Sequence, residues 1–114
     1  MSILFAGMPV TDIGSAREWY ERLLGRPPDM VPHDREVVWQ LAGAGWVYVV
    51  ENPERAGKSL LTLLVEDLDA EVASVAERGL SPDARMEGPP RKAEFLDPDG
   101  NKVTFGQPGP RAER

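Results

Sequence analysis

The hydrophobic and polar positions near the start of the chain follow two periods, one typical of a strand and one typical of a helix. Residues 3–10 form an apolar run of strand length that includes Gly7 and Pro9, and because proline cannot donate a backbone hydrogen bond, a bulged strand or an edge strand is expected. Between residues 16 and 24, apolar side chains recur every three or four positions, which predicts a helix. Ser15, followed three positions later by a glutamate, is predicted to cap this helix, and Gly25 to end it.

Two further strands are predicted in the middle of the chain. Residues 37–41 and 46–51 are rich in valine, tryptophan and tyrosine. The four residues between them alternate alanine and glycine, so the two strands are expected to form a hairpin. Residues 52–59 combine proline and glycine with charged side chains, which predicts a linker between two halves of the chain.

The second half of the chain repeats this order of elements. Its pattern predicts a strand at 60–65, a helix at 68–76, and strands at 91–96 and 102–107. Asp67 stands where it can cap the helix, and Gly79 is expected to end it. Residues 97–101 are Asp-Pro-Asp-Gly-Asn, which is typical of a tight turn. Residues 108–114 are expected to form a polar tail.

The two halves align around short matching segments. Val-Thr-Asp at 10–12 and Val-Glu-Asp at 65–67 both stand directly before a predicted helix, 55 residues apart. This repeat indicates two copies of a βαβββ module within one domain. We place module 1 at residues 3–52 and module 2 at residues 59–107.

Two of the predicted strands are apolar on both faces. Residues 46–50 carry aromatic or valine side chains at every position, and residues 60–65 are interrupted only by Thr62. A sheet with one solvated face would alternate apolar and polar side chains. One face is therefore expected to cover the helices, and the other to meet a partner subunit, a ligand cavity or both.

Composition narrows the chemistry that this chain can perform. Its 114 residues suit one domain, and without cysteine it has no disulfide, thiolate metal site or cysteine nucleophile. His33 is the only histidine, so a metal site would need to be rich in carboxylates. A net charge of −6 without a basic stripe argues against nucleic-acid binding. Because no signal-like segment and no apolar run of about 20 residues is found, we expect a cytoplasmic protein that binds no membrane.

Two sequence motifs resemble those of a known superfamily. Residues 10–25, with Val-x-Asp and then Ala-x-x-Trp-Tyr-x-x-x-Leu-Gly, are similar to the first signature of the vicinal oxygen chelate superfamily. This group contains glyoxalase I, bleomycin-resistance proteins and extradiol dioxygenases. Residues 95–103, Phe-x-Asp-Pro-Asp-Gly-Asn-x-Val, resemble its second signature. The resemblance covers residues 3–107 and implies an α+β fold, in which two βαβββ modules form a mixed sheet that curls into a cup with helices on its outer face. It also implies a homodimer with two cups at the interface.

The metal ligands of the superfamily can be compared with this chain position by position. In metal-dependent members four side chains in the cup bind a divalent ion, and the resemblance places those positions at Phe5, Tyr48, Leu60 and Thr104. Phenylalanine and leucine offer no donor atom, and a neutral tyrosine or threonine is a poor ligand. We therefore expect no metal, no other cofactor and no metal-assisted lyase or dioxygenase chemistry.

What remains resembles the bleomycin-resistance branch, whose members hold a planar molecule between subunits without a metal. The leading hypothesis is a binding protein for a small aromatic or largely apolar, drug-like molecule, which acts by sequestration as in antibiotic resistance. No catalytic residue is assigned, and the acidic chain slightly favours a cationic ligand. Aromatic walls bury planar ligands well. The predicted ligand-binding residues are Phe5, Trp39, Trp46, Tyr48, Leu60, Thr62 and Thr104.

Two other functions stay open at this point. A glyoxalase-like or dioxygenase-like enzyme could use the cup without the usual metal, with Tyr48, His33 or Glu51 supplying acid and base groups. A structural or regulatory dimer could instead fill the cup with its own side chains. His33 also has a simpler interpretation, as a solvated loop residue.

Overall fold

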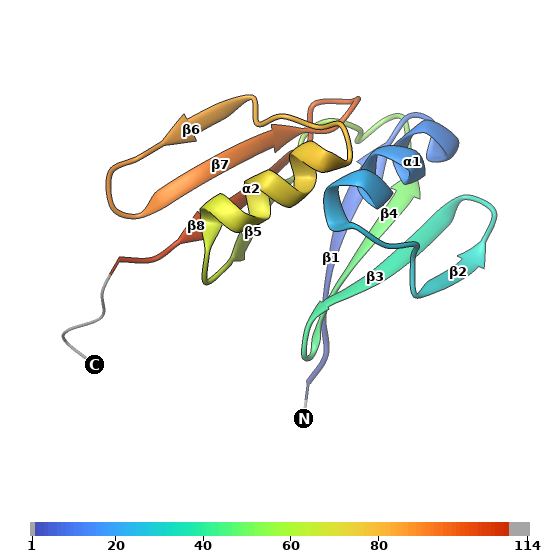
Figure 1. Cartoon of the computed structure of the whole chain (residues 1–114). Coiled ribbons are helices and arrows are strands. Elements are labelled where there is room, and N and C mark those ends of the chain that lie inside the picture. The colour runs from blue at the N-terminus through green and yellow to red at the C-terminus, as the bar shows by residue number, and fades with distance from the viewer. Residues whose placement is uncertain (1, 110–114) are drawn as a thin grey trace.

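The computed structural model describes residues 2–109, which form two four-stranded sheets with one helix on each (Figure 1). The strands of sheet A are β1 (Leu4–Val10), β2 (Met30–His33), β3 (Glu36–Ala42) and β4 (Gly45–Glu51), and α1 (Ile13–Leu24) covers them. The strands of sheet B are β5 (Leu60–Leu64), β6 (Ala84–Met86), β7 (Arg91–Leu96) and β8 (Lys102–Gln107), and α2 (Leu68–Glu77) covers them.

The two sheets have the same topology and register. The strand order is β1-β4-β3-β2 in sheet A and β5-β8-β7-β6 in sheet B. The first two strands of each order are parallel and the other pairs are antiparallel. Phe5 lies opposite Trp46 in sheet A, as Leu60 lies opposite Lys102 in sheet B. Each position on one sheet therefore has a counterpart on the other.

The predicted elements are all present, and the structure adds two strands that the pattern did not predict. These are β2 and β6, whose residues are all exposed. Neither has a buried face, and each exists because it pairs with the neighbouring strand β3 or β7. Pro9 lies in the edge strand β1, as expected. Of the predicted polar tail, residues 110–114 lie outside the described part of the chain.

The start of α1 differs from the prediction. Asp12, and not Ser15, is the N-cap residue, because its carboxylate oxygen Oδ2 accepts hydrogen bonds from the Ser15 amide (3.3 Å) and hydroxyl (2.9 Å). The predicted end of the helix is confirmed. Gly25 adopts a left-handed conformation (φ 82°), and its amide donates to the Glu21 carbonyl. Asp67 caps α2 as predicted, by accepting from the Ala70 amide.

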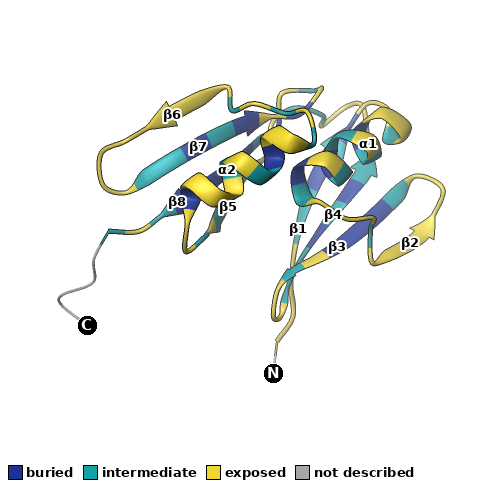
Figure 2. Cartoon of the chain, viewed as in Figure 1, coloured by how far each residue is buried: buried dark blue, intermediate teal, exposed yellow. Residues whose placement is uncertain are grey.

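A continuous apolar core lies between the helices and the sheets. Figure 2 shows buried residues on the strands beneath α1 and α2, with exposed residues on the outer sides of the helices. Alternate side chains on each strand point to this core, as the strand period requires. The core residues of the strands are Met8, Val10, Val37, Trp39, Val47, Val49, Ala93, Phe95, Val103 and Phe105.

The turn between β7 and β8 joins the two halves of the molecule. Asp97 is only 4% exposed, and its Oδ2 accepts hydrogen bonds from the Tyr20 hydroxyl of α1 and from the Asn101 amide group, both at 2.8 Å. Asn101 also donates to the Pro9 carbonyl of β1 at 2.7 Å. The Asp99 carboxylate accepts from the amide and hydroxyl of Thr11. The turn of sheet B is thereby bound to both the first strand and the first helix.

Tyr20 is the buried ionisable group of this junction. Burial raises the pKa of its hydroxyl well above its usual value of 10, and the neighbouring Asp97 charge raises it further. The hydroxyl therefore stays protonated and acts as a donor to Asp97.

A second link between the two halves of the molecule comes from Arg78, which follows α2. Its guanidinium donates to the Arg22 and Leu23 carbonyls at the end of α1.

We expect the Tyr20→Phe variant to unfold more easily than the wild type, by about 1–3 kcal/mol, because Asp97 then keeps its burial but loses one donor. The measurement is the free energy of unfolding from urea titrations. Tyr48→Phe is the matched control, since the Tyr48 side chain makes no hydrogen bond within residues 2–109. Equal free energies for the two variants would contradict the role given to the Tyr20–Asp97 bond.

We also expect alkaline pH to weaken the fold through Tyr20. Its pKa is raised in the folded protein, so the stabilisation is complete below the unfolded value of 10 and is lost as the pH rises above it. The unfolding free energy of the wild type, relative to that of Tyr20→Phe, should fall by about 1.4 kcal/mol per pH unit above pH 10. A difference that stays constant from pH 9 to pH 11 would show that Tyr20 ionises normally.

Candidate functional site

The face of sheet A that carries no helix holds a group of aromatic side chains. Phe5, Trp46 and Tyr48 alternate with core residues along β1 and β4, so they share this face, which we call open face A. The Phe5 and Trp46 rings are stacked, with centroids 5.9 Å apart and planes 19° apart. The Phe5 and Tyr48 centroids lie 6.5 Å apart. Phe5 is 49% exposed, so the group offers an aromatic surface that the rest of the chain leaves uncovered.

Gly7 sets the position of the Tyr48 ring on open face A. The two residues lie opposite each other in β1 and β4, and the ring lies directly over the glycine. A Cβ atom at position 7 would come within 2.6 Å of the Tyr48 Cζ atom. Any other residue at this position would therefore displace the tyrosine ring.

The corresponding face of sheet B, which we call open face B, is formed by Leu60, Thr62, Leu64, Lys102 and Thr104 on its first two strands. Leu60 and Leu64, at the two ends of β5, are 79% and 70% exposed, which is unusually high for leucine. Thr104 is buried beside them. Both sheets thus leave one face uncovered.

The four positions at which the superfamily binds metal fall at matching places on the two open faces. Phe5 and Leu60 correspond to each other in register, as do Tyr48 and Thr104. None of these side chains supplies a carboxylate or an imidazole, so the set does not fit a divalent ion. Within residues 2–109, no three histidine, aspartate or glutamate side chains gather in a metal-binding arrangement.

One cavity contacts open face A, and a larger one contacts open face B. One, of about 240 Å³, lies beside Tyr48 and is lined also by Gly7, Pro9, Val50, Asn52, Arg55 and Ser59. The other, of about 530 Å³, lies between the end of α1, the β3–β4 hairpin and β5, and includes Thr62 and Leu64. Neither cavity contains residues from both predicted walls. The single chain therefore does not bring Phe5, Trp46 and Tyr48 together with Leu60, Thr62 and Thr104 in one pocket.

Trp39 was predicted to line the ligand site, and the structure corrects this placement. It lies on the helix-covered face of β3 and is fully buried. Its indole Nε1 donates to the Arg26 carbonyl, and its ring lies 6.0 Å from that of Tyr20. Trp39 belongs to the core because it follows the alternation of Val37 and Leu41 and not that of Val38.

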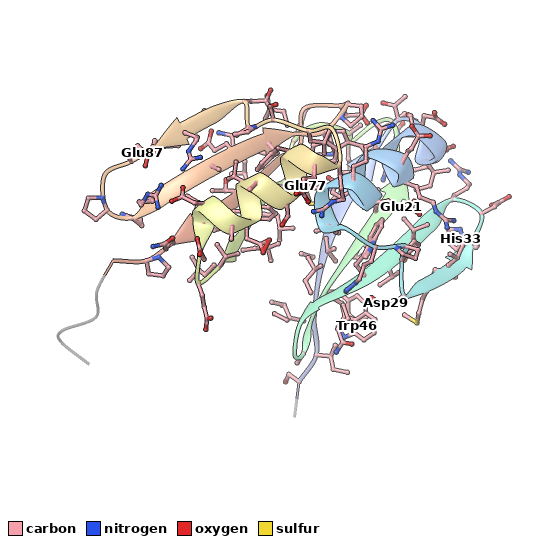
Figure 3. The ribbon with its side chains drawn as sticks, in the orientation of Figure 1. Glu21, Asp29, His33, Trp46, Glu77 and Glu87 are labelled. Carbon is pink, nitrogen blue, oxygen red and sulfur yellow. The ribbon has the colours of Figure 1, made fainter. Side chains whose placement is uncertain are left out.

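His33 and Glu51, the other two acid and base candidates, do not lie beside Tyr48. His33 lies at the outer edge of sheet A, away from Trp46 (Figure 3), where its imidazole is 3.3 Å from the Glu36 carboxylate. Glu51 points to the opposite face from Tyr48. Its carboxylate accepts from the Ile13 amide at the start of α1 and lies 3.4 Å from Arg35.

Open face B also carries three charged residues, of which sequence reasoning missed Glu94 and Lys102. Glu94 and Lys92 alternate with buried Ala93 and Phe95 on β7, so they share a face with Thr104 and Lys102. The Lys102 ammonium and the Glu94 carboxylate lie 3.5 Å apart. The same alternation is visible in the sequence and could have identified these residues.

No helix within residues 2–109 is long and apolar enough to cross a membrane.

Comparison with solved structures places this geometry among known proteins. The chain is similar to a glyoxalase/bleomycin resistance protein from Catenulispora acidiphila DSM 44928, with 44% identity, a TM-score of 0.89 and coverage of 94% of this chain and 98% of that one. TnmS3, described as an antibiotic binding protein from Streptomyces sp. CB03234, shares 26% identity with a TM-score of 0.73, and the match covers 96% and 97% of the two chains.

A more distant match shows the fold alone. It is to lactoylglutathione lyase from Agrobacterium tumefaciens, with 17% identity, a TM-score of 0.72 and coverage of 93% and 92%. A search of curated proteins found no match. These likenesses confirm the fold predicted from the two motifs. The family model for the Glyoxalase/Bleomycin resistance protein/Dioxygenase superfamily matches residues 2–105. The chain therefore belongs to this superfamily.

Proposed function

We propose that this protein binds a small aromatic or largely apolar molecule without a metal and acts by sequestering it. The observation that carries the proposal is the exposed aromatic group of open face A, in which Phe5 stacks on Trp46 beside Tyr48. An aromatic surface of this kind favours a planar ligand through burial of apolar area and ring stacking. Two members of this aromatic group, Phe5 and Tyr48, stand at positions where metal-dependent members of the superfamily bind the ion. Aromatic contacts with the ligand would therefore take the place of metal coordination.

The site is completed by a second copy of the chain. Phe5, Leu60 and Leu64 are all largely exposed, and apolar surface of this extent is normally covered in a functional protein. Because neither cavity described above joins the two open faces within residues 2–109, a homodimer would let open face A of one copy meet open face B of the other. A ligand between them would be enclosed by an aromatic wall and by a wall of leucine and threonine.

The arrangement favours capture of the ligand over catalysis. A general acid or base must lie within hydrogen-bond reach of the reacting group. Glu51 is directed to the other face of the sheet, where it holds the start of α1, and His33 lies with Glu36 at the sheet edge. Tyr48 is the one candidate left on the open face. The description of TnmS3 as an antibiotic binding protein supports the same choice.

We expect neutral 2-naphthamide to bind to the wild type at one molecule per chain, with no change when EDTA is added. Trp46→Ala should weaken this binding by about tenfold, because it removes the ring that stacks on Phe5. The measurement is isothermal titration calorimetry, with Glu18→Ala on the exposed side of α1 as the control. Loss of binding on adding EDTA, or equal affinity for the Trp46 and Glu18 variants, would contradict the proposal.

Gly7→Ala tests the same site without removing a ring. The added methyl group should displace the Tyr48 ring and lower the affinity for 2-naphthamide, although every aromatic side chain is still present. The control is Gly88→Ala, because a Cβ atom there meets nothing within 4 Å.

We expect the wild type to sediment at twice the chain mass of 12.6 kDa and the Leu60→Lys/Leu64→Lys variant at the chain mass. Two ammonium groups on open face B would oppose burial against a second copy. Sedimentation equilibrium measures the mass, and Ala73→Lys, on the exposed side of α2, is the control. A wild type that stays monomeric at high concentration would contradict the completed site.

A further inference from the structure

The two open faces have the same backbone register but opposite chemistry. On open face A, the middle row across the strands is Gly7, Tyr48 and Val38. On open face B, the corresponding row is Thr62, Thr104 and Glu94. Lys102 takes the place that Trp46 has in sheet A, since each lies opposite the first residue of its open face. In the completed site, an aromatic wall therefore faces a wall that combines Leu60 and Leu64 with threonine and charged side chains.

The charged residues of open face B carry a local excess of positive charge. Glu94 is held 3.5 Å from Lys102, and their side chains are 22% and 39% exposed. Lys92 lies on the other side of the same row, opposite Gly106, and forms no ion pair within residues 2–109. Two lysines and one glutamate thus flank the two threonines. These charges lie nearest to the threonines, and salt screens charges beyond about 8–10 Å. The charged Glu36 of open face A lies instead beside His33, at the outer edge of sheet A.

If a second copy covers open face B, the charged side chains on this face interact more strongly with a bound ligand. A lysine on a solvated surface interacts weakly with its neighbours, but removal of water strengthens each charge–charge and charge-assisted hydrogen bond. Thr104 is already buried, and its hydroxyl can donate to a ligand oxygen. The pairing of Glu94 with Lys102 holds that ammonium group over the sheet and leaves further donors for a ligand.

We propose, on the basis of the proposed aromatic site, that the ligand is an aromatic acid or another ring compound with an anionic oxygen at its edge, such as a carboxylate or phenolate. Its ring lies against Phe5 and Trp46, and its oxygen atoms receive hydrogen bonds from Lys102 and Thr104, with Lys92 adding to the positive field. Glu94 is a positioning residue for Lys102. This preference is opposite to the cationic ligand that the net charge of −6 favours, since local charges outweigh distant ones.

Three naphthalene probes of the same shape test this inference: 2-naphthoate, neutral 2-naphthamide and cationic 2-naphthylmethylamine. We expect the wild type to bind 2-naphthoate at least about tenfold more tightly than the cation at pH 7.5, as one charge-assisted hydrogen bond can provide. In Lys92→Met/Lys102→Met the affinity for 2-naphthoate should fall to that for 2-naphthamide. Arg22→Met, which removes a charge from the exposed side of α1, should keep the preference. Circular dichroism of each variant checks that it folds.

Failure of this inference can be distinguished from failure of the proposed function. If all three probes bound with equal affinity, and Trp46→Ala weakened the binding of each, the anion preference would be overturned and the aromatic site would stand. Tighter binding of the cation, weakened by Glu94→Gln, would overturn it in favour of the opposite charge. If none of the probes bound, or if binding did not depend on Trp46, the proposed aromatic site itself would fail.

Discussion

The buried hydrogen bonds of Asp97 are the interaction on which the rest of the structure depends. Asp97 shapes its own turn by accepting from the Asp99 and Asn101 amides, and it binds α1 of the other half through Tyr20. Asn101 then holds β1 through the Pro9 carbonyl. Because a buried carboxylate is costly unless each oxygen has partners, the junction is stable only when both halves are in place. This constraint fixes the two sheets relative to each other and the helices against their inner faces, so that the described residues leave the other face of each sheet uncovered by a helix.

The repeat of one module in two copies accounts for the division of chemistry between these faces. Identical strand register gives every residue of open face A a counterpart on open face B. The core sides of both sheets stayed apolar, because both pack on a helix. The open sides differ: Trp46 and Tyr48 stand where Lys102 and Thr104 stand in the second copy. A site built from one face of each kind can recognise a ring and a polar edge at the same time, which neither face could do alone.

Much of this arrangement could be predicted from the sequence, and the failures have physical causes. Periodicity located the helices and the long strands because their apolar faces pack on a core. It missed β2 and β6, which have no buried face and depend on their neighbours. The N-cap was misplaced because Asp12 and Ser15 can both cap a helix, and only the three-dimensional contacts decide between them. Trp39 was assigned to the wrong face although its strand does alternate: Val37, Trp39 and Leu41 form the apolar side, and Gln40 lies on the other. Phe5, Tyr48, Leu60 and Thr62 do lie on the open faces, and their union in one site by a second copy of the chain is part of the proposed function.

In the proposed function, the ligand binds on the open faces and not in the larger cavity between α1, the β3–β4 hairpin and β5. Backbone amide chemical shifts of the isotope-labelled protein, followed during titration with 2-naphthoate, distinguish these two places. Binding on the open faces should give the largest changes at Gly7, Tyr48, Thr104 and Glu94. Changes concentrated instead at Leu24, Leu41 and Val65 would place the ligand in the cavity between the halves and would rule out the proposed site.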